Sequence, residues 1–176
     1  MSDTLFLPPL PRHTLLRESE RVARLQLAQP QIEVILKEET NAVALQAALV
    51  AMLWDVLPQL SWCGFYRQVA EKMLAVGPYQ GPLSCLRIPF NRGVCGFTAT
   101  TQQMQIVPDV HALPYHIACE AATRSELTLP IFDASHQFHA VLDLDSHSPA
   151  GFSMAEAGIL EKMLSDLFSQ PGIDWN

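Results

Sequence analysis

The segment HIACEAATRSEL, residues 116–127, places one cysteine between a histidine and two carboxylates. Cys119 lies three residues after His116, directly before Glu120 and seven residues before Glu126. The thiolate is the nucleophilic form of cysteine, and a nearby acid can supply the proton that a leaving oxygen needs. Three interpretations of Cys119 are therefore open: a packed core residue, a metal ligand, or a nucleophile with an acid close by.

The other three cysteines differ in their surroundings. Cys63 lies in the apolar stretch SWCGFYRQ, and we expect it in the core, where free cysteine is common. Cys95 lies in GVCG, where close backbone packing favours a small side chain, so a core role and a secondary redox role both stay open. Cys85, like Cys119, lies in a loop rich in glycine and proline. Together Cys85 and Cys119 suggest a nucleophile and a resolving thiol.

A zinc site is the alternative for these loops. His111, His116, Cys119 and Cys85 could supply four ligands. Structural zinc sites commonly use closely paired ligands in both halves of the motif, and this spacing does not match them. We therefore predict no metal.

Carboxylates also occur at strand spacing. Asp143 and Asp145 in LDLDS are two residues apart, so they share one face of a predicted strand. This is either the solvent end of the strand or an anionic pocket for an ammonium group or a metal. Glu126 opens the neighbouring predicted strand, and in an apolar pocket its raised pKa would let it donate a proton near neutral pH.

Two aromatic residues share a face of the first predicted strand. Trp62 and Tyr66 are four residues apart. Most such pairs belong to the core, but they could equally form an aromatic wall beside an ammonium or a sulfonium-like centre.

Composition limits the classes of function. The chain has 176 residues, 49% of them apolar, which suits one globular domain. Its net charge of −7 makes a nucleic-acid partner a poor fit, because phosphate binding needs a basic face. The start lacks the pattern of a signal peptide, and the most apolar segment, residues 41–60, carries Asn, Gln and Asp. We therefore expect no membrane association and a cytoplasmic protein with reduced thiols.

Periodicity gives the order of the elements. We expect an extended N-terminal arm over residues 1–16 and a single domain over 17–176. Helices are expected over residues 17–37 (with Pro30 as an interruption or a start), 40–57, 93–101 and 153–169; strands are expected over 61–68, 72–77, 104–107, 125–132 and 137–145. This order predicts an α+β fold or an α/β/α sandwich around a mostly antiparallel sheet.

Three ordered motifs carry a resemblance to a known family. GPYQGPLSCLRIPFNRGVCG, VPDVHALPYHIACEAATRSEL and AVLDLDS resemble the free methionine-(R)-sulfoxide reductases, which are GAF-domain enzymes. The resemblance covers roughly residues 40–168. It implies an α+β GAF fold in which a central six-stranded antiparallel sheet is flanked by helices. It also implies free methionine (R)-sulfoxide as substrate, thioredoxin as external reductant, no bound cofactor and a homodimer.

The resemblance also assigns roles to residues. It implies that Cys119 attacks the sulfoxide sulfur, that Cys85 resolves the product as a disulfide, and that Cys95 is a third motif cysteine of the catalytic set. The substrate pocket is implied at Trp62, Tyr66, Glu126, Asp143 and Asp145. The chemistry of the residues adds the hypothesis that Glu126 is also catalytic and supplies or shares the proton that the sulfoxide oxygen needs. Pro82 and Ser84 stand where the family usually has Lys and Ala, and Tyr115 replaces a Gly.

Two other functions remain for a chain with this fold. One is a non-catalytic GAF module that binds a small ligand and regulates a partner, since fold alone does not give function. The other is a redox sensor whose thiols switch conformation without turning over a substrate. Turnover restricted to the free (R)-sulfoxide separates the enzyme from both.

Overall fold

The computed structural model describes residues 7–8, 10–113 and 121–175. Its elements follow in chain order: α1 Glu18–Leu36, α2 Ala42–Val56, β1 Leu60–Ala70, β2 Met73–Gln80, β3 Arg87–Pro89, α3 Gly93–Thr101, β4 Gln105–Val107, the short 3₁₀ helix η1 Val110–Ala112, β5 Ser125–Phe132, β6 Phe138–Ser146 and α4 Met154–Phe168. The catalytic candidate Cys119 lies outside the described residues, as do His116, Tyr115 and Glu120.

The six strands form one sheet. Their order is β3-β2-β1-β6-β5-β4, and every neighbouring pair is antiparallel. This confirms the predicted six-stranded antiparallel sheet of an α+β fold. Because side chains alternate along each strand, the sheet presents two different faces.

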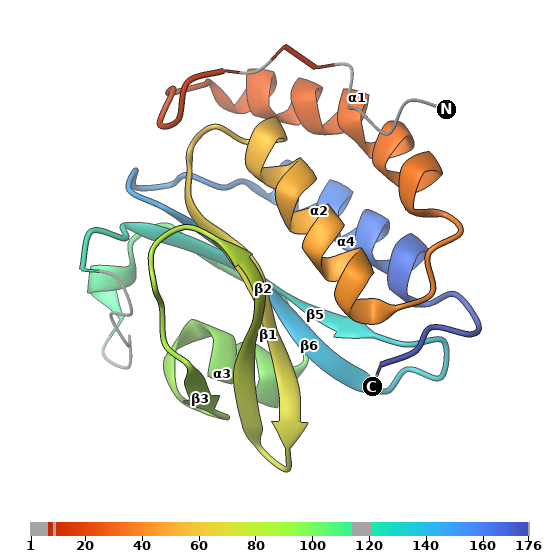
Figure 1. Ribbon diagram of the computed structural model, residues 1–176. Coiled ribbons are helices and arrows are strands. Elements are labelled where there is room, and N and C mark those ends of the chain that lie inside the picture. Colours follow the sequence, from red (N-terminus) through yellow and green to blue (C-terminus); the bar gives the residue numbers. More distant parts are fainter. Residues whose placement is uncertain (1–6, 9, 114–120, 176) are drawn as a thin grey trace.

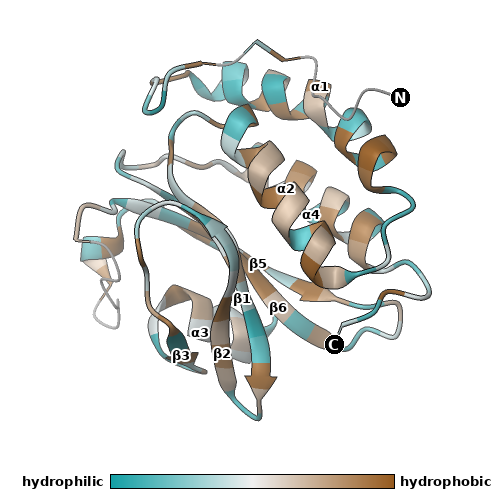
Figure 2. Ribbon diagram, in the orientation of Figure 1, coloured by the Kyte–Doolittle hydropathy of each residue, from teal (hydrophilic) through white to brown (hydrophobic). Residues whose placement is uncertain are grey.

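The larger hydrophobic core lies on one face of the sheet, under α1, α2 and α4 (Figure 1). Leu45, Leu49 and Leu53 of α2 recur at helical spacing and are fully buried there. Asn41 caps this helix by accepting a hydrogen bond from the backbone N–H of Ala44. Figure 2 shows α2 in mostly hydrophobic colours along its length, as expected for a helix covered by α1 on its outer side.

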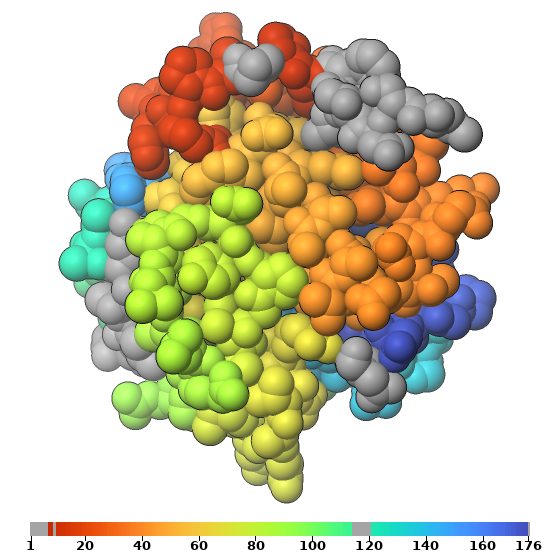
Figure 3. All heavy atoms as spheres, in the orientation of Figure 1, coloured from red at the N-terminus to blue at the C-terminus, as the bar shows by residue number. Residues whose placement is uncertain are grey.

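The opposite face carries α3, and the short strand β3 extends the sheet at its edge beside β2 (Figure 1). The sequence did not predict β3, because three residues in a stretch rich in glycine and proline give too little alternation. The segment that joins β2 to β3 lies on the surface of the molecule, in yellow-green in Figure 3.

Pro30 does not interrupt the first helix as expected. Helix α1 continues through it from Glu18 to Leu36. Proline lacks only its own N–H, so one hydrogen bond is lost, and the buried residues Ala28 and Ile32 on either side are held by packing against the core.

Charged side chains fasten the first helix and the segment before it. Arg21 donates to both carboxylate oxygens of Glu156, at 2.8 and 2.9 Å, and Glu156 forms the predicted capping box with Ser153. Arg12 donates to the carbonyls of Trp54 and Leu57 at the C-terminal end of α2.

Within the described ranges, no helix combines the length and the apolar character that a membrane span requires.

Candidate functional site

The predicted pocket residues meet in rows that cross three neighbouring strands. In the first row Trp62 of β1 lies opposite Asp145 of β6, which lies opposite Glu126 of β5. In the second row Gly64 lies opposite Asp143, which lies opposite Thr128. These residues belong to the sheet face that carries α3, since their neighbours Leu127, Leu142 and Leu144 point into the core under the other helices.

Aromatic rings form one wall of this site. The ring of Trp62 stacks on Tyr66 at 5.6 Å and on Tyr79 of β2 at 5.3 Å. The indole N–H of Trp62 donates to the carbonyl of Pro82 at 3.1 Å, and the Tyr66 hydroxyl hydrogen-bonds the Ser84 hydroxyl at 3.0 Å. The wall is therefore fixed to the loop that carries Cys85.

Two buried carboxyl groups and a thiol lie at the centre. The ligand atoms of Cys95, Glu126 and Asp143 are all within 4.8 Å of one another. The Cys95 thiol donates to Oε1 of Glu126 at 3.9 Å. Glu126 and Asp143 are each only 6% exposed, while Asp145 beside them is partly exposed.

This burial changes which groups are charged. Burial, followed by the negative charges of Asp143 and Asp145, raises the pKa of Glu126 well above its usual range. Burial also raises the pKa of Asp143, to about 7, against the smaller lowering effect of hydrogen bonds from Cys95 and Glu126. Near neutral pH, Glu126 is therefore a protonated acid, whereas Asp143 is the first of the two to become an anion.

Cys95 is a neutral thiol in this setting. It is buried beside the N-terminal end of α3, where the helix dipole alone would favour a thiolate. Burial, followed by the charges of Asp143 and Glu126, instead raises the pKa of Cys95 well above its usual value. Its chemistry in the reduced protein is therefore that of a hydrogen-bond donor.

Helix α3 closes over the acids through contacts with the sheet and β3. Thr98, one turn after Cys95, shares a 2.5 Å hydrogen bond with Thr128, and both hydroxyl groups are buried. A Cβ on Gly96 would lie 2.4 Å from the carbonyl oxygen of Pro89, so only glycine allows this close approach to β3. These contacts fix the Cys95 thiol against Glu126.

The remaining cysteines occupy distinct places. Cys63 is fully buried in the helix-side core, as expected, and burial raises the pKa of its thiol strongly. Cys85 is half-buried, packs against the cluster that contains Trp62 and Tyr66, and is disulfide-bonded. The predicted nucleophile Cys119 lies outside the described residues.

The acid cluster suits a cationic group. Oδ1 of Asp143 has no hydrogen-bond partner among the described residues, although it is buried. A buried anionic oxygen without a partner is costly, so a ligand that brings an ammonium group would be stabilised there. A thiol and two carboxyls could also ligate a metal ion, but two of these three groups would first have to lose strongly held protons.

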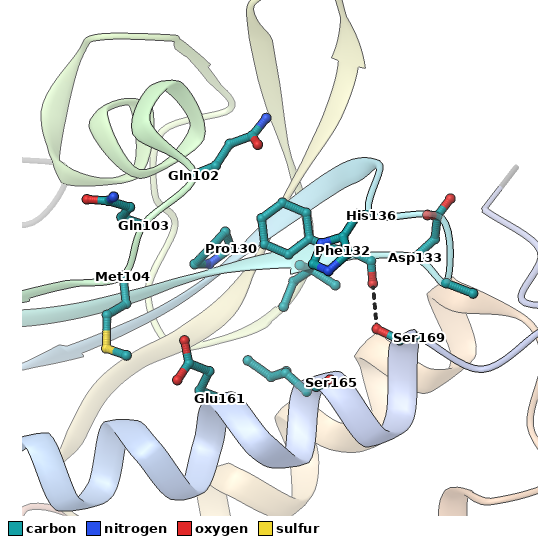
Figure 4. Close-up of a pocket in the computed structure, with 13 residues that line it drawn as sticks. Gln102, Gln103, Met104, Pro130, Phe132, Asp133, His136, Glu161, Ser165 and Ser169 are labelled. Carbon is teal, nitrogen blue, oxygen red and sulfur yellow. Dashed lines mark hydrogen bonds between the residues drawn. The ribbon is translucent and has the colours of Figure 1, made fainter.

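A cavity lies away from the acid cluster, between the end of α3, β5 and α4. It has a volume of about 740 Å³ and is lined from the end of α3, β5 and α4 by residues that include Gln102, Phe132 and Glu161 (Figure 4). None of the predicted site residues that the structure describes lines it. We therefore place the functional site at the acid cluster.

Sequence reasoning missed several residues of the site. Tyr79 completes the aromatic wall, Ser84 holds Tyr66, and Thr98 with Thr128 joins α3 to the sheet. Alternation along β5 did predict that Thr128 shares a face with Glu126, but not its contact with Thr98. The others come from separate elements, and only tertiary packing brings them into contact.

Comparison with known proteins supports the likeness, although no family model matches the chain. Free methionine-R-sulfoxide reductase of Escherichia coli is 38% identical over 129 residues, which cover 73% of this chain and 77% of that protein. The solved structure of free methionine-R-sulfoxide reductase from Neisseria meningitidis, in complex with its substrate, is 38% identical with a TM-score of 0.80, over 88% of this chain and 93% of that one.

A further solved structure has a similar fold. A structure described as that of the GAF domain is 31% identical with a TM-score of 0.79, over 88% of this chain and 90% of that one. The GAF fold implied by the motifs is thus confirmed. With these similarities in sequence and in backbone, the chain belongs to the free methionine-R-sulfoxide reductase family.

Proposed function

We propose that this protein reduces free L-methionine (R)-sulfoxide to L-methionine. The observation that carries the proposal is the buried, unpartnered carboxylate oxygen of Asp143 beside the protonated acid Glu126, within an aromatic wall. A zwitterionic sulfoxide supplies what this arrangement lacks, namely an ammonium group for the anion and an oxygen for the acid. The Neisseria meningitidis relative, solved with its substrate, supports the same assignment.

The substrate ammonium is held by Asp143 and Asp145. This contact explains a preference for the free amino acid, because a peptide-bound methionine has no ammonium to offer. Trp62 and Tyr66 face the sulfoxide end, where an aromatic surface favours a centre that gains positive charge as its oxygen is protonated. Binding and chemistry thus use neighbouring rows of the same sheet face.

The reaction begins with proton transfer, since a sulfoxide is a poor electrophile until its oxygen is protonated. Glu126 donates that proton while the Cys119 thiolate attacks sulfur, and methionine leaves as the oxygen remains on Cys119 as a sulfenic acid. The Cys85 thiolate then attacks the sulfenic sulfur; the S–S bond forms, the S–O bond breaks, and the oxygen leaves as hydroxide, which takes up a proton from solvent and becomes water. Thioredoxin, the proposed reductant, restores both thiols by exchange.

Cys95 has a supporting part in this scheme. Its raised pKa makes it a weak nucleophile, and its hydrogen bond to Glu126 keeps that acid oriented. We therefore assign redox chemistry to Cys85 and Cys119 and not to Cys95.

The decisive experiment is a coupled assay in which NADPH consumption through thioredoxin reductase and thioredoxin reports turnover. Free methionine (R)-sulfoxide, free methionine (S)-sulfoxide and N-acetylmethionine (R)-sulfoxide are compared. We expect turnover of the first compound only. Equal rates with the N-acetylated compound would contradict the ammonium site, and no turnover of any of them would contradict the enzyme.

The thiol assignment has its own measurement. Reduced protein is treated with one equivalent of the (R)-sulfoxide without reductant, digested with protease and analysed by mass spectrometry. We expect a peptide pair joined through Cys85 and Cys119. A pair joined through Cys95 and Cys119 alone would instead make Cys95 the resolving thiol.

A further inference from the structure

Two exposed leucines flank Cys85. Leu83 is 74% exposed and Leu86 is 59% exposed, and the loop between them carries Ser84 and Cys85. Pro82, next to Leu83, is exposed as well. Isolated exposed leucines are common on protein surfaces, but here three apolar residues surround a single redox-active position.

The loop is held in this arrangement by three hydrogen bonds. The carbonyl of Pro82 accepts from the Trp62 indole, Ser84 pairs with the Tyr66 hydroxyl, and the backbone N–H of Val76 donates to the carbonyl of Leu86 at 3.2 Å. These contacts turn Ser84 and Cys85 toward the sheet and leave the two leucines outside. The segment lies on the face shown in Figure 3, in yellow-green.

We propose that Leu83 and Leu86 form the docking surface for a protein dithiol of the thioredoxin class, an inference that rests on the proposed function. Disulfide exchange requires the attacking sulfur to approach the target sulfur directly. A protein that delivers its thiol to Cys85 must therefore place the surface around that thiol on the residues beside Cys85. Those residues are apolar, so the partner has an apolar rim around its exposed thiol.

The reduction of the disulfide by the partner takes two steps. A partner thiolate attacks the Cys85 sulfur, the bond between Cys85 and Cys119 breaks, and Cys119 leaves as a thiolate. The second partner thiolate then attacks the partner's own sulfur in the mixed disulfide, which releases Cys85 as a thiolate. The partner is oxidised to a disulfide, and this chain gains the two electrons.

The small size of the surface suits a reductant that must leave after each cycle. Contacts of redox partners are among the smaller protein interfaces, and a few side chains supply most of the binding energy of an interface. A small thiol such as dithiothreitol makes no use of such a surface. This difference allows docking and chemistry to be measured separately.

The test compares two reductants on the double variant Leu83→Ser/Leu86→Ser. We expect the KM for thioredoxin to rise by roughly tenfold or more, because the contact loses two leucine side chains that it would otherwise bury. The rate with saturating dithiothreitol should stay unchanged. Leu83→Met/Leu86→Met should restore the KM, and Leu27→Ser, which removes an equally exposed leucine on α1, should not affect it.

Three outcomes would overturn the inference. An unchanged KM for thioredoxin would show that the leucines do not contact the reductant. An equal loss with dithiothreitol would show that they act on Cys85 itself. A change in molar mass by light scattering, with no change in KM, would assign them to an interface between copies of this chain. Absence of turnover by the unaltered protein with dithiothreitol would instead refute the proposed function.

Discussion

At the scale of residues, two carboxyl groups on neighbouring strands take different protonation states because their surroundings differ. Glu126 is buried and faces two further carboxyl groups, so it keeps its proton. Burial raises the pKa of Asp143 to about 7, while its hydrogen bonds with Cys95 and Glu126 favour the anion and keep the rise smaller. One acid and one anion within reach of the same small molecule are what a protonated sulfoxide and an ammonium group require.

The first prediction concerns the acid. Glu126→Gln removes the transferable proton but keeps the size of the side chain, so we expect kcat with free methionine (R)-sulfoxide to fall by about 10²–10⁴-fold. The measurement is steady-state turnover with dithiothreitol as reductant. Glu71→Gln, which alters an exposed carboxyl at the turn between β1 and β2, is the matched control and should leave kcat unchanged. Near-normal turnover in Glu126→Gln would remove Glu126 from the acid role.

The second prediction concerns pH. A carboxyl whose folded pKa is raised stabilises the protein at pH values below its unfolded pKa, and that contribution is lost as pH rises through about 7. The affinity for an ammonium group has the opposite pH dependence. It increases as pH rises, because the ammonium binds the Asp143 anion. We therefore expect the Kd of reduced protein for free methionine to fall by about tenfold per unit between pH 5 and 7, then to level off.

Calorimetric titration measures this Kd directly and avoids the ionisation of the catalytic thiol, which affects turnover. The control is Asp143→Asn, in which binding should be weak and nearly independent of pH over the same interval. A Kd of the unaltered protein that does not change with pH would show that Asp143 is already an anion at pH 5, or that it does not hold the ammonium.

At the scale of elements, the sheet register decides which side chains meet. Alternation in the sequence correctly predicted that Asp143 and Asp145 share a face, and the strand ranges were close to those observed. Alternation within one strand does not give its register against the next. The rows Trp62 to Glu126 and Gly64 to Thr128 depend on the register of β6 against β1 and β5, which the sequence does not signal.

The contribution of β2 and of the loop after it was also beyond prediction. Ser84 reaches Tyr66 and Tyr79 reaches Trp62 in the register that β2 takes against β1, which shifts by one residue between Gly64 and Tyr66 because β2 has an extra residue there. The edge strand β3 was missed for a related reason, since its three residues are stabilised by pairing with β2 and not by their own pattern. Local sequence therefore predicted the elements, while long-range contacts determined the walls of the site.

The third prediction tests one such contact. A Cβ on Gly64 would lie 2.4 Å from Cβ of Tyr79 and 2.5 Å from Cη2 of Trp62. Gly64→Ala must therefore displace the aromatic wall, and we expect it to destabilise the fold by about 1–3 kcal/mol and to lower kcat/KM by up to roughly 10²-fold. The measurements are urea unfolding and turnover of the free (R)-sulfoxide.

Gly158→Ala is the matched control. Gly158 lies in α4 with nothing within 4 Å of the added methyl, so alanine should stabilise the helix by about 0.5–1 kcal/mol and leave turnover unchanged. If both substitutions had the same effect on turnover, the close approach at Gly64 would not be what shapes the aromatic wall.

At the scale of the whole molecule, the two faces of the sheet have separate tasks. The face under α1, α2 and α4 holds the larger apolar cluster and supplies most of the stability. The other face holds a smaller cluster, in which Trp62, Tyr66 and Cys95 are members of both the packing and the site. Changes on the helix side should therefore alter stability without altering turnover of the folded protein.

The last prediction uses this separation. Arg21 of α1 and Glu156 of α4 form an ion pair whose side chains are 10% and 1% exposed. Arg21→Met leaves the Glu156 carboxylate without its cation, and we expect the free energy of unfolding in urea to fall by about 3–5 kcal/mol at pH 7. Turnover per folded molecule should not change, because the pair lies with the helices, away from the acid cluster.

Two further variants show whether burial of the charge is the cause. Arg21→Met/Glu156→Leu removes both charges and should recover most of the lost stability, apart from about 1 kcal/mol for the capping box with Ser153. Lys162→Met breaks an exposed ion pair with Asp166 and should cost no more than about 0.5 kcal/mol. If the double variant were as unstable as Arg21→Met alone, the loss would come from the packing of the arginine stem between α1 and α4 and not from an uncompensated carboxylate.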